Sequence, residues 1–426
     1  MFHDIRAMNE KERVLVVVVT QKFPNVWTPQ DIAQEMRELV LTCGGDVKDT
    51  IFCSVEKFSP SHLIGQGKVN EIFVRCAAGD IDTVIMSYDL KGVQQRNLEQ
   101  DLKVKVIDRT QLILDIFARH ASSLEGKMQV ELAQLEYALP RLTGHGEEMS
   151  RLGGGIGTLG PGETQLETDR RKIGARIITL KEKLAEIVSN RAVKRKKRED
   201  SSVPLISLVG YTNAGKSTLL NALTGAHQVT HDGLFTTLDS LARQYTLPNH
   251  QKVVLSDTVG FIHQLPHSLI EAFKATLEEV AEADLLLHVL DISNPKSRNL
   301  YDAVNEVLKE IGALEKPTIT VLNKIDAVED RGWFEGIYGN IHNPIVISAK
   351  TGENLDVLAH KILEDLSYMV AEVDVVLPIT RMDLVSLAHR EGEVFSIKYY
   401  NNEIHLRASL PKRREGLFKK AACRKP

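Results

Sequence analysis

The segment Gly210–Thr218, with the sequence GYTNAGKST, has the residue types and spacing of a loop that binds phosphate. In such a loop, backbone N–H groups surround the phosphates, Lys216 reaches the β- and γ-phosphates, and the Ser217 hydroxyl is a ligand for Mg²⁺. An apolar run, LISLVG, precedes the segment and a helical pattern, KSTLLNALTG, follows it, as this chemistry requires. The predicted phosphate-binding residues are Gly210, Tyr211, Thr212, Asn213, Ala214, Gly215, Lys216, Ser217 and Thr218.

A second segment, NKID, indicates which base the nucleotide carries. Asn323, Lys324 and Asp326 follow the strand-like run TITVL. The Asp326 carboxylate can accept two hydrogen bonds from the guanine edge, which adenine cannot offer, although this tetrapeptide alone is also compatible with ordinary capping residues. The run PIVI leads to a third segment, SAK, which we predict supports the base with Ser348, Ala349 and Lys350.

Two further segments are placed to contact the γ-phosphate and the metal ion. SDTVG follows the strand pattern VVL, so that Asp257 faces Mg²⁺ through water and the Gly260 amide faces the γ-phosphate. In LFTTLD, Thr237 is the expected Mg²⁺ ligand and Thr236 the alternative. These segments add Phe235, Thr236, Thr237, Leu238, Asp239, Asp257, Thr258, Val259 and Gly260 to the predicted site. The predicted metal ligands are Ser217, Thr237 and Asp257, and the predicted catalytic residues are Lys216, Thr237 and Gly260.

The residue after Gly260 raises a question about hydrolysis. A GTPase needs an oriented water molecule, and the phenyl ring of Phe261 cannot accept a hydrogen bond from it in the required geometry. We therefore predict slow hydrolysis by the isolated chain and acceleration by a partner. The alternative is that Phe261 is simply packed and that His263 or another side chain does the catalysis. A separate alternative concerns Asn213, which either helps to hold K⁺ or only orders the phosphate loop.

Length and composition place these segments in a multidomain globular protein. The chain has 426 residues, of which 43% are hydrophobic and 26% charged, with a net charge of -4. Its apolar run VLVVVV, Val14–Val19, is too short to span a membrane, so we expect no stable membrane insertion. Four cysteines lack disulfide or zinc-ligand spacing and predict inert thiols in a reducing cytoplasm: Cys43, Cys53, Cys76 and Cys423.

Periodicity divides the chain into four predicted domains. Residues 1–115 alternate strand and helix patterns, which indicates a small parallel α/β domain. Residues 116–201 carry apolar residues at spacings of three and four in two stretches, which predicts an antiparallel helical hairpin around a Gly-rich loop. Residues 202–370 predict the doubly wound sheet of a P-loop GTPase domain. Residues 371–426 predict a small α+β domain with a basic tail.

Positive charge is concentrated in two places. Twelve Lys and Arg residues lie between Arg170 and Arg198 against Glu182 and Glu186, and the segment Lys412–Lys425 is also basic. Such runs are compatible with a solvated face or with contact to nucleic-acid phosphates. Between the two predicted hairpin helices lies the Gly-rich segment Gly144–Glu163, which we predict is a functional loop.

The chain resembles the HflX family within the Obg-HflX group of translation-linked GTPases. The resemblance rests on GYTNAGKST, FTTLD, DTVGFI, NKID and SAK, and upstream on LIGQGKVNEI, QQRNLE, VIDRTQLILDIFA and GGGIGTLGPGETQLETDRR. It implies a cytoplasmic GTPase that alternates between GTP and GDP, binds the large ribosomal subunit and ribosomal RNA, and separates stalled or idle ribosomes into subunits under stress. We also expect a monomer away from the ribosome.

Two other classes of function stay open at this stage. The first is an NTP-driven remodeller of ribosomal RNA with a second nucleotide site at Gly65–Lys68, whose sequence GQGK is also compatible with a structural turn. The second is a GTP-switched signalling protein that acts on a protein partner. No peptide groove or amphipathic membrane helix is evident in the sequence to favour it.

Overall fold

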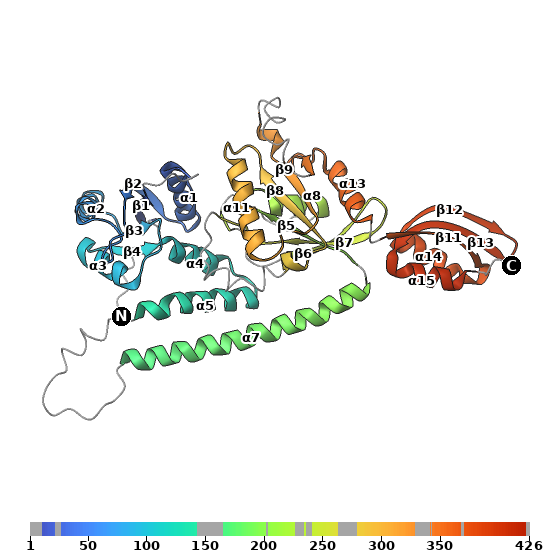
Figure 1. Cartoon of the computed structure of the whole chain (residues 1–426), viewed down its shortest axis with the longest axis horizontal. Helices are drawn as coiled ribbons and strands as arrows, with labels where there is room; N and C mark the ends of the chain where they lie inside the picture. The colour runs from blue at the N-terminus through green and yellow to red at the C-terminus, as the bar shows by residue number, and fades with distance from the viewer. Residues whose placement is uncertain are drawn as a thin grey trace. The chain divides into compact units, whose positions relative to one another are not determined.

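The computed structural model, drawn in Figure 1, describes residues 11–21, 27–142, 165–201, 203–225, 234–235, 241–262, 279–328, 341, 343–367 and 370–422. Their contacts divide the chain into two compact units. The first contains the described residues up to Ile187 together with Leu234 and Phe235, and the second contains the other described residues. The four domain boundaries expected from the sequence stay a prediction.

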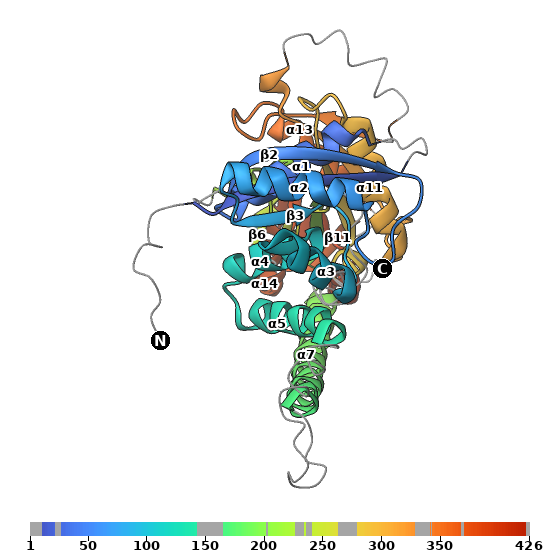
Figure 2. The same ribbon diagram turned by 90° about the vertical axis from the view of Figure 1, so that its left-hand side faces the viewer.

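The first unit is built on a four-stranded parallel sheet in the order β2-β1-β3-β4. Its central strand is the apolar run that includes Val14–Val19, all six of which are buried. Helices α2 and α3 pack on one face through a shared apolar cluster and lie in front of the sheet in Figure 2, with α1 and α4 behind it. The elements are β1 (Arg13–Gln21), α1 (Pro29–Thr42), β2 (Asp46–Val55), α2 (Gln66–Gly79), β3 (Thr83–Met86), α3 (Gly92–Leu102), β4 (Lys105–Asp108) and α4 (Arg109–His120).

Two further helices follow, as the heptad spacing predicts. They are α5 (Leu124–Ala138), which continues as a 3-10 turn over Leu139–Leu142, and the long α7 (Gln165–Ser201). Leu132 on α5 packs with Ile177, Leu180 and Leu184 on α7. Two ion pairs also join these helices, Arg176 with Glu131 at 2.7 Å and Lys181 with Glu136 at 2.7 Å. The Gly-rich segment between the two helices lies outside the described residues.

The second unit contains a six-stranded sheet in the order β10-β9-β8-β5-β7-β6. Its strands are parallel except β6, which is antiparallel to β7. Helices α8 and α13 share one apolar core with the sheet, while α11 lies on the other face (Figure 1). The elements are β5 (Leu205–Gly210), α8 (Lys216–Thr224), β6 (Leu241–Thr246), β7 (Lys252–Asp257), β8 (Leu285–Asp291), α11 (Ser297–Glu310), β9 (Thr318–Asn323), β10 (Pro344–Val346) and α13 (Leu355–Asp365). This is the doubly wound sheet expected from the sequence.

The edge strand β6 is an element that the sequence did not predict. Its residues, LARQYT, are mostly exposed and lack the apolar alternation of the other strands. It forms because a tight turn, in which the Leu247 N–H donates to the carbonyl oxygen of Gln251 at 2.9 Å, returns the chain alongside β7.

The end of the chain forms a three-stranded antiparallel sheet in the order β11-β13-β12 with two helices, in agreement with the predicted α+β class. Within the expected basic tail, residues Lys412–Ala421 form helix α15, which the sequence did not predict. Its Phe418 side chain is fully buried in the core of this sheet. The elements are β11 (Val370–Pro378), α14 (Met382–Glu391), β12 (Glu393–Tyr400), β13 (Glu403–Pro411) and α15 (Lys412–Ala421).

None of the described helices is long and apolar enough to cross a bilayer. Cys43, Cys53 and Cys76 are free thiols, and Cys423 lies outside the described residues. Burial raises the pKa of the Cys76 thiol to about 11. A thiol with so high a pKa is chemically inert at neutral pH.

Candidate nucleotide site

The predicted phosphate loop lies at the carboxyl end of β5, directly before α8. Two glycines allow its sharp turn. A Cβ atom on Gly210 would lie 2.3 Å from the Val289 carbonyl oxygen, and one on Gly215, at φ +93°, would lie 2.3 Å from Asn323 Nδ2. Only glycine therefore fits at either position, and the loop amides can gather at the amino end of α8, where the helix dipole favours anions.

Lys216 is folded back into this loop. Its Nζ atom donates to the carbonyl oxygens of Gly210 at 3.1 Å and Tyr211 at 2.9 Å, and its side chain is almost fully buried. Burial lowers the pKa of Lys216 to about 8, an effect that the charge of Asp257 partly offsets. A phosphate placed in the loop would restore a full counter-charge to this ammonium group.

The Ser217 hydroxyl donates to Asp257 Oδ2 at 2.6 Å. The structure thus brings together two of the three predicted metal ligands, from α8 and from the end of β7. Hard oxygen ligands of this kind fit Mg²⁺, which uses few protein groups when it also binds phosphates. Among the described residues, no group of three or more His, Cys, Asp or Glu side chains could hold a metal ion.

The segment after β7 is joined directly to the phosphate loop. The Thr212 N–H donates to the Phe261 carbonyl oxygen at 2.8 Å, and the Phe261 N–H donates to the Gly210 carbonyl oxygen at 3.1 Å. The Phe261 side chain is buried, with 2% of its surface exposed. Gly260 lies so close to the loop that a Cβ atom there would be 2.7 Å from Thr212 Cγ2. A movement of the phosphate loop must therefore displace the segment after β7, and the reverse also holds.

Asn323 connects the predicted base-binding segments to the phosphate loop. Its Nδ2 atom donates to the Ala214 carbonyl oxygen at 2.9 Å, and its Oδ1 atom accepts from the Ala349 N–H at 3.0 Å. Both contacts are buried. Three segments that are far apart in the sequence are thus held by one amide side chain.

The predicted base-recognition carboxylate is also held in place. The Ser348 hydroxyl donates to Asp326 Oδ1 at 2.6 Å, and the Asp326 residue remains exposed. Lys324, with a φ of +69°, forms an ion pair with Asp291 at 2.8 Å. Sequence reasoning missed Asp291, although its place at the end of β8, next to β9 in a parallel sheet, is a signal that could have found it.

A buried histidine that the sequence did not single out lies on β8. His288 pairs in register with Val209 of β5 and stacks on Tyr301, with ring centroids 4.7 Å apart and planes inclined by 6°. Burial, together with the nearby charge of Lys216, lowers the pKa of His288 to about 3. The ring is therefore neutral at physiological pH and serves packing.

Several predicted residues are not part of this arrangement. Thr236, Thr237, Leu238 and Asp239 lie outside the described residues, and so does His263. Phe235 is described, but it belongs to the first compact unit. The structure thus assembles the predicted site from the phosphate loop, the segment after β7, NKID and SAK.

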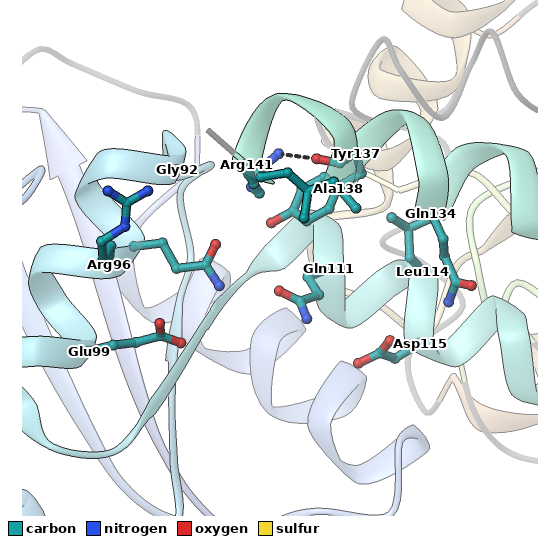
Figure 3. A pocket seen from close by; sticks show the side chains of 12 residues that line it. Gly92, Arg96, Glu99, Gln111, Leu114, Asp115, Gln134, Tyr137, Ala138 and Arg141 are labelled. Atoms are coloured by element: carbon teal, nitrogen blue, oxygen red, sulfur yellow. Dashed lines mark hydrogen bonds between the residues drawn. The ribbon is translucent and has the colours of Figure 1, made fainter. Parts of the chain in front are cut away.

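The first unit contains a cavity of about 400 Å³, shown in Figure 3, between α3, α4 and the end of α5. Arg141 lines it and forms an ion pair with the buried Asp108 at 3.2 Å. It also donates to the Leu90 carbonyl oxygen at 2.6 Å and lies 3.4 Å from the centre of the Tyr137 ring. The cavity is not lined by Gly65–Lys68. Gly65 is instead the N-cap residue of α2, and Lys68, inside that helix, pairs with Glu71 at 2.8 Å.

Three family profiles match the chain in succession. They are described as GTP-binding GTPase N-terminal over residues 30–118, GTP-binding GTPase Middle Region over residues 120–198, and 50S ribosome-binding GTPase over residues 205–324. The GTPase HflX of Caldanaerobacter subterraneus is 44% identical over 403 residues, which cover 94% of this chain and 91% of that protein. The chain belongs to the HflX family of GTPases.

Other HflX proteins match over similar lengths. The GTPase HflX of Lacrimispora saccharolytica is 43% identical over 401 residues, covering 94% of each chain, and that of Escherichia coli is 44% identical over 346 residues, covering 81% of each. A solved GTP-binding protein from Sulfolobus solfataricus in complex with GDP is 28% identical, with a TM-score of 0.44 over 84% of this chain and 99% of that one. The resemblance to HflX inferred from the motifs is confirmed.

Proposed function

We propose that this HflX protein hydrolyses GTP slowly by itself, binds the large ribosomal subunit, and separates stalled or idle ribosomes into subunits in the stressed cytoplasm. The observation that supports GTP binding is the Asn323 amide, which joins the phosphate loop to SAK. The ribosomal part is supported by the profile described as 50S ribosome-binding GTPase and by membership of the HflX family.

Each part of the site has a proposed task in binding. Lys216 would exchange its two carbonyl contacts for the β- and γ-phosphates, and Asp326 would accept hydrogen bonds from the guanine edge. Ser217, Asp257 and Thr237 would hold Mg²⁺, which when bound supplies positive charge to the phosphate oxygens. The Gly260 amide would donate to the γ-phosphate.

The proposed slow hydrolysis follows from Phe261. Its ring is buried and carries no group that could orient water, while its backbone is bonded to the phosphate loop. A missing catalytic group supplied by a partner is worth about a thousandfold or more in other GTPases. We therefore propose that the ribosome orders the site or supplies a group.

Asn213 is the candidate for K⁺ binding. It has a φ of +61°, so the loop backbone is turned sharply at this residue. A monovalent cation held there would supply positive charge during hydrolysis. Equal hydrolysis rates in K⁺ and Na⁺ buffers would leave Asn213 with a role in loop structure only.

Contact with ribosomal RNA is proposed for the first turns of α7 and the preceding loop. Arg170, Arg171 and Lys172 are exposed there, and basic side chains bind phosphates with release of counterions. Arg151 and the glycines of the loop lie outside the described residues. Deletion of Gly153–Gly157 should abolish subunit separation while GTP binding is retained.

Sedimentation of ribosomes with the protein tests the proposal. With GTP or a non-hydrolysable analogue we expect the 70S peak to convert to subunits and the protein to migrate with the large subunit, whereas GDP should give neither result. If the protein ignores ribosomal particles in every nucleotide state, the ribosomal proposal is wrong. ATP binding by the first unit would instead favour the RNA remodeller, and capture of a protein partner without RNA would favour the signalling protein.

A further inference from the structure

The structure places two residues of the predicted LFTTLD segment inside the first compact unit. Leu234 and Phe235 group with that unit, whereas the phosphate loop, Asp257 and Asn323 belong to the second. Both side chains are buried, with 3% of Leu234 and 2% of Phe235 exposed. A segment that is expected to report on the γ-phosphate is therefore held by the part of the chain that does not carry the phosphate loop.

Specific contacts hold these two residues. The Leu234 N–H donates to Thr42 Oγ1, at the last residue of α1, at 3.2 Å. The Phe235 ring meets Phe117 of α4 edge to face, with centroids 4.7 Å apart and planes inclined by 78°. This is the favourable geometry for an aromatic pair.

The backbone conformation of Phe235 also indicates that the first unit holds this residue in place. Its φ of +58° lies in the left-handed region, which a bulky aromatic residue rarely adopts. Such a conformation persists where the surroundings enforce it. The contacts with Thr42 and Phe117 provide these surroundings, so the docking is a defined structural state.

Chain length connects this docking to the nucleotide. Thr237 follows Phe235 by two residues, and two residues of extended chain reach about 7 Å. If Thr237 contacts the metal ion and the γ-phosphate, then either the docking site lies within that reach or Phe235 must leave it. In the first case docking confines Thr237 near the metal ion and should favour GTP, and in the second case GTP binding and docking should exclude each other.

We propose that Phe235 is a positioning residue of the GTPase, through which the γ-phosphate changes the first unit and the first unit changes the preference for GTP over GDP. This inference rests on the proposed role of Thr237. GDP lacks the γ-phosphate, so docking should affect GTP binding much more than GDP binding. Thermodynamic linkage requires that the γ-phosphate changes the docking equilibrium by the same factor by which docking changes the preference for GTP over GDP.

The test compares the affinities of GDP and a non-hydrolysable GTP analogue in full-length variants. Phe235→Ala removes the docked ring, and Thr42→Val removes the acceptor of the Leu234 N–H while keeping the side-chain shape. Thr179→Val is the matched control, because the Thr179 hydroxyl bonds the carbonyl four residues earlier on exposed α7, just as Thr42 bonds the Glu38 carbonyl. We expect the affinity ratio to change by at least about fivefold in Phe235→Ala, by less in Thr42→Val, and not in Thr179→Val.

Hydrogen exchange of the wild-type protein gives a second readout. It would not depend on the bound nucleotide if Phe235 had only a structural role. The protection factor of the Leu234 amide should differ between the GDP complex and the analogue complex. The size of this difference should equal the factor by which Phe235→Ala changes the ratio of analogue affinity to GDP affinity. An unchanged ratio in a folded Phe235→Ala protein, or equal protection in both complexes, overturns the inference. Neither measurement needs ribosomes or hydrolysis, so failure of the proposed ribosomal function would be seen separately.

Discussion

Asn323 Nδ2 lies 2.9 Å from the Ala214 carbonyl oxygen, and this hydrogen bond joins the end of β9 to the phosphate loop. The same side chain accepts the Ala349 N–H, so the carboxyl end of β9, the phosphate loop and SAK share one buried amide. A guanine nucleotide bound across these segments would therefore meet a site that is held together before it binds. Because these segments are already held together in the free protein, nucleotide binding has a smaller entropic cost of ordering them.

Asn323→Ala should weaken nucleotide binding strongly. It leaves the Ala349 N–H and the Ala214 carbonyl oxygen without this partner, and each buried unsatisfied group costs about 1–3 kcal/mol. We expect GDP affinity to fall by about a hundredfold, measured by titration with a fluorescent GDP analogue. Lys296→Ala, on the same unit but away from these contacts, is the control, and equal affinities of the two variants would contradict the role given to Asn323.

Asp326→Asn should change the base that the site accepts. The Ser348 hydroxyl can still donate to the side-chain oxygen, but an N–H group now faces the guanine N–H groups. A site built for one hydrogen-bond pattern rejects the wrong one by large factors, so we expect GTP affinity to fall by about a thousandfold. Xanthosine triphosphate, which has an oxygen in place of the guanine amino group, should bind the variant more tightly than GTP does. Competition between the two nucleotides measures this directly.

Lys216 should make GDP binding depend on pH. Burial lowers its pKa to about 8 in the nucleotide-free protein, and phosphate raises it in the complex. Between these two values the complex holds more protons than the free protein, so affinity is full below pH 8 and falls as pH rises through 8. We expect about a tenfold loss between pH 7 and pH 9. Lys216→Met should bind weakly and without this slope, and the same slope in the variant would assign the effect to another group.

The site was predictable wherever short motifs coincide with strand ends. Residues such as Lys216 and Asn323 lie in contiguous segments, and the parallel sheet brings those segments to one edge. Edge strand β6 was missed because its LARQYT sequence buries little and carries no apolar alternation. Helix α15 was not predicted as an element, because lysines and arginines dominate its sequence and Phe418 gives only a weak apolar signal.

Long-range contacts left no such local signal. The pairing of Phe235 with Phe117 joins residues more than a hundred positions apart, and an isolated phenylalanine before two threonines does not indicate what its ring contacts. The ion pair of Lys324 with Asp291 also has no local signal in the sequence, because it depends on β8 and β9 being neighbours in the sheet. Such contacts follow from the tertiary fold rather than from spacing.

Gly260→Ala should stop hydrolysis and disturb the phosphate loop. The new Cβ atom would lie 2.7 Å from Thr212 Cγ2, 2.9 Å from Thr212 Cα and 3.0 Å from Lys216 Nζ. Distances this short force backbone to move, which displaces the Gly260 amide from the γ-phosphate and strains the Thr212 bond to Phe261. We expect the single-turnover hydrolysis rate to fall at least about a hundredfold, as when one preorganised donor is lost from an active site. GDP affinity should fall less, by about tenfold, because GDP does not use this amide.

Gly67→Ala is the matched glycine control for that variant. Gly67 lies in helix α2, and a Cβ atom there would meet nothing within 4 Å. Alanine is the better helix former by about 0.5–1 kcal/mol, so the free energy of unfolding should rise slightly while hydrolysis stays at the wild-type rate. If Gly260→Ala hydrolysed GTP as fast as Gly67→Ala, the close approach of Gly260 to the phosphate loop would have no part in the reaction, and the group that contacts the γ-phosphate would have to be sought elsewhere.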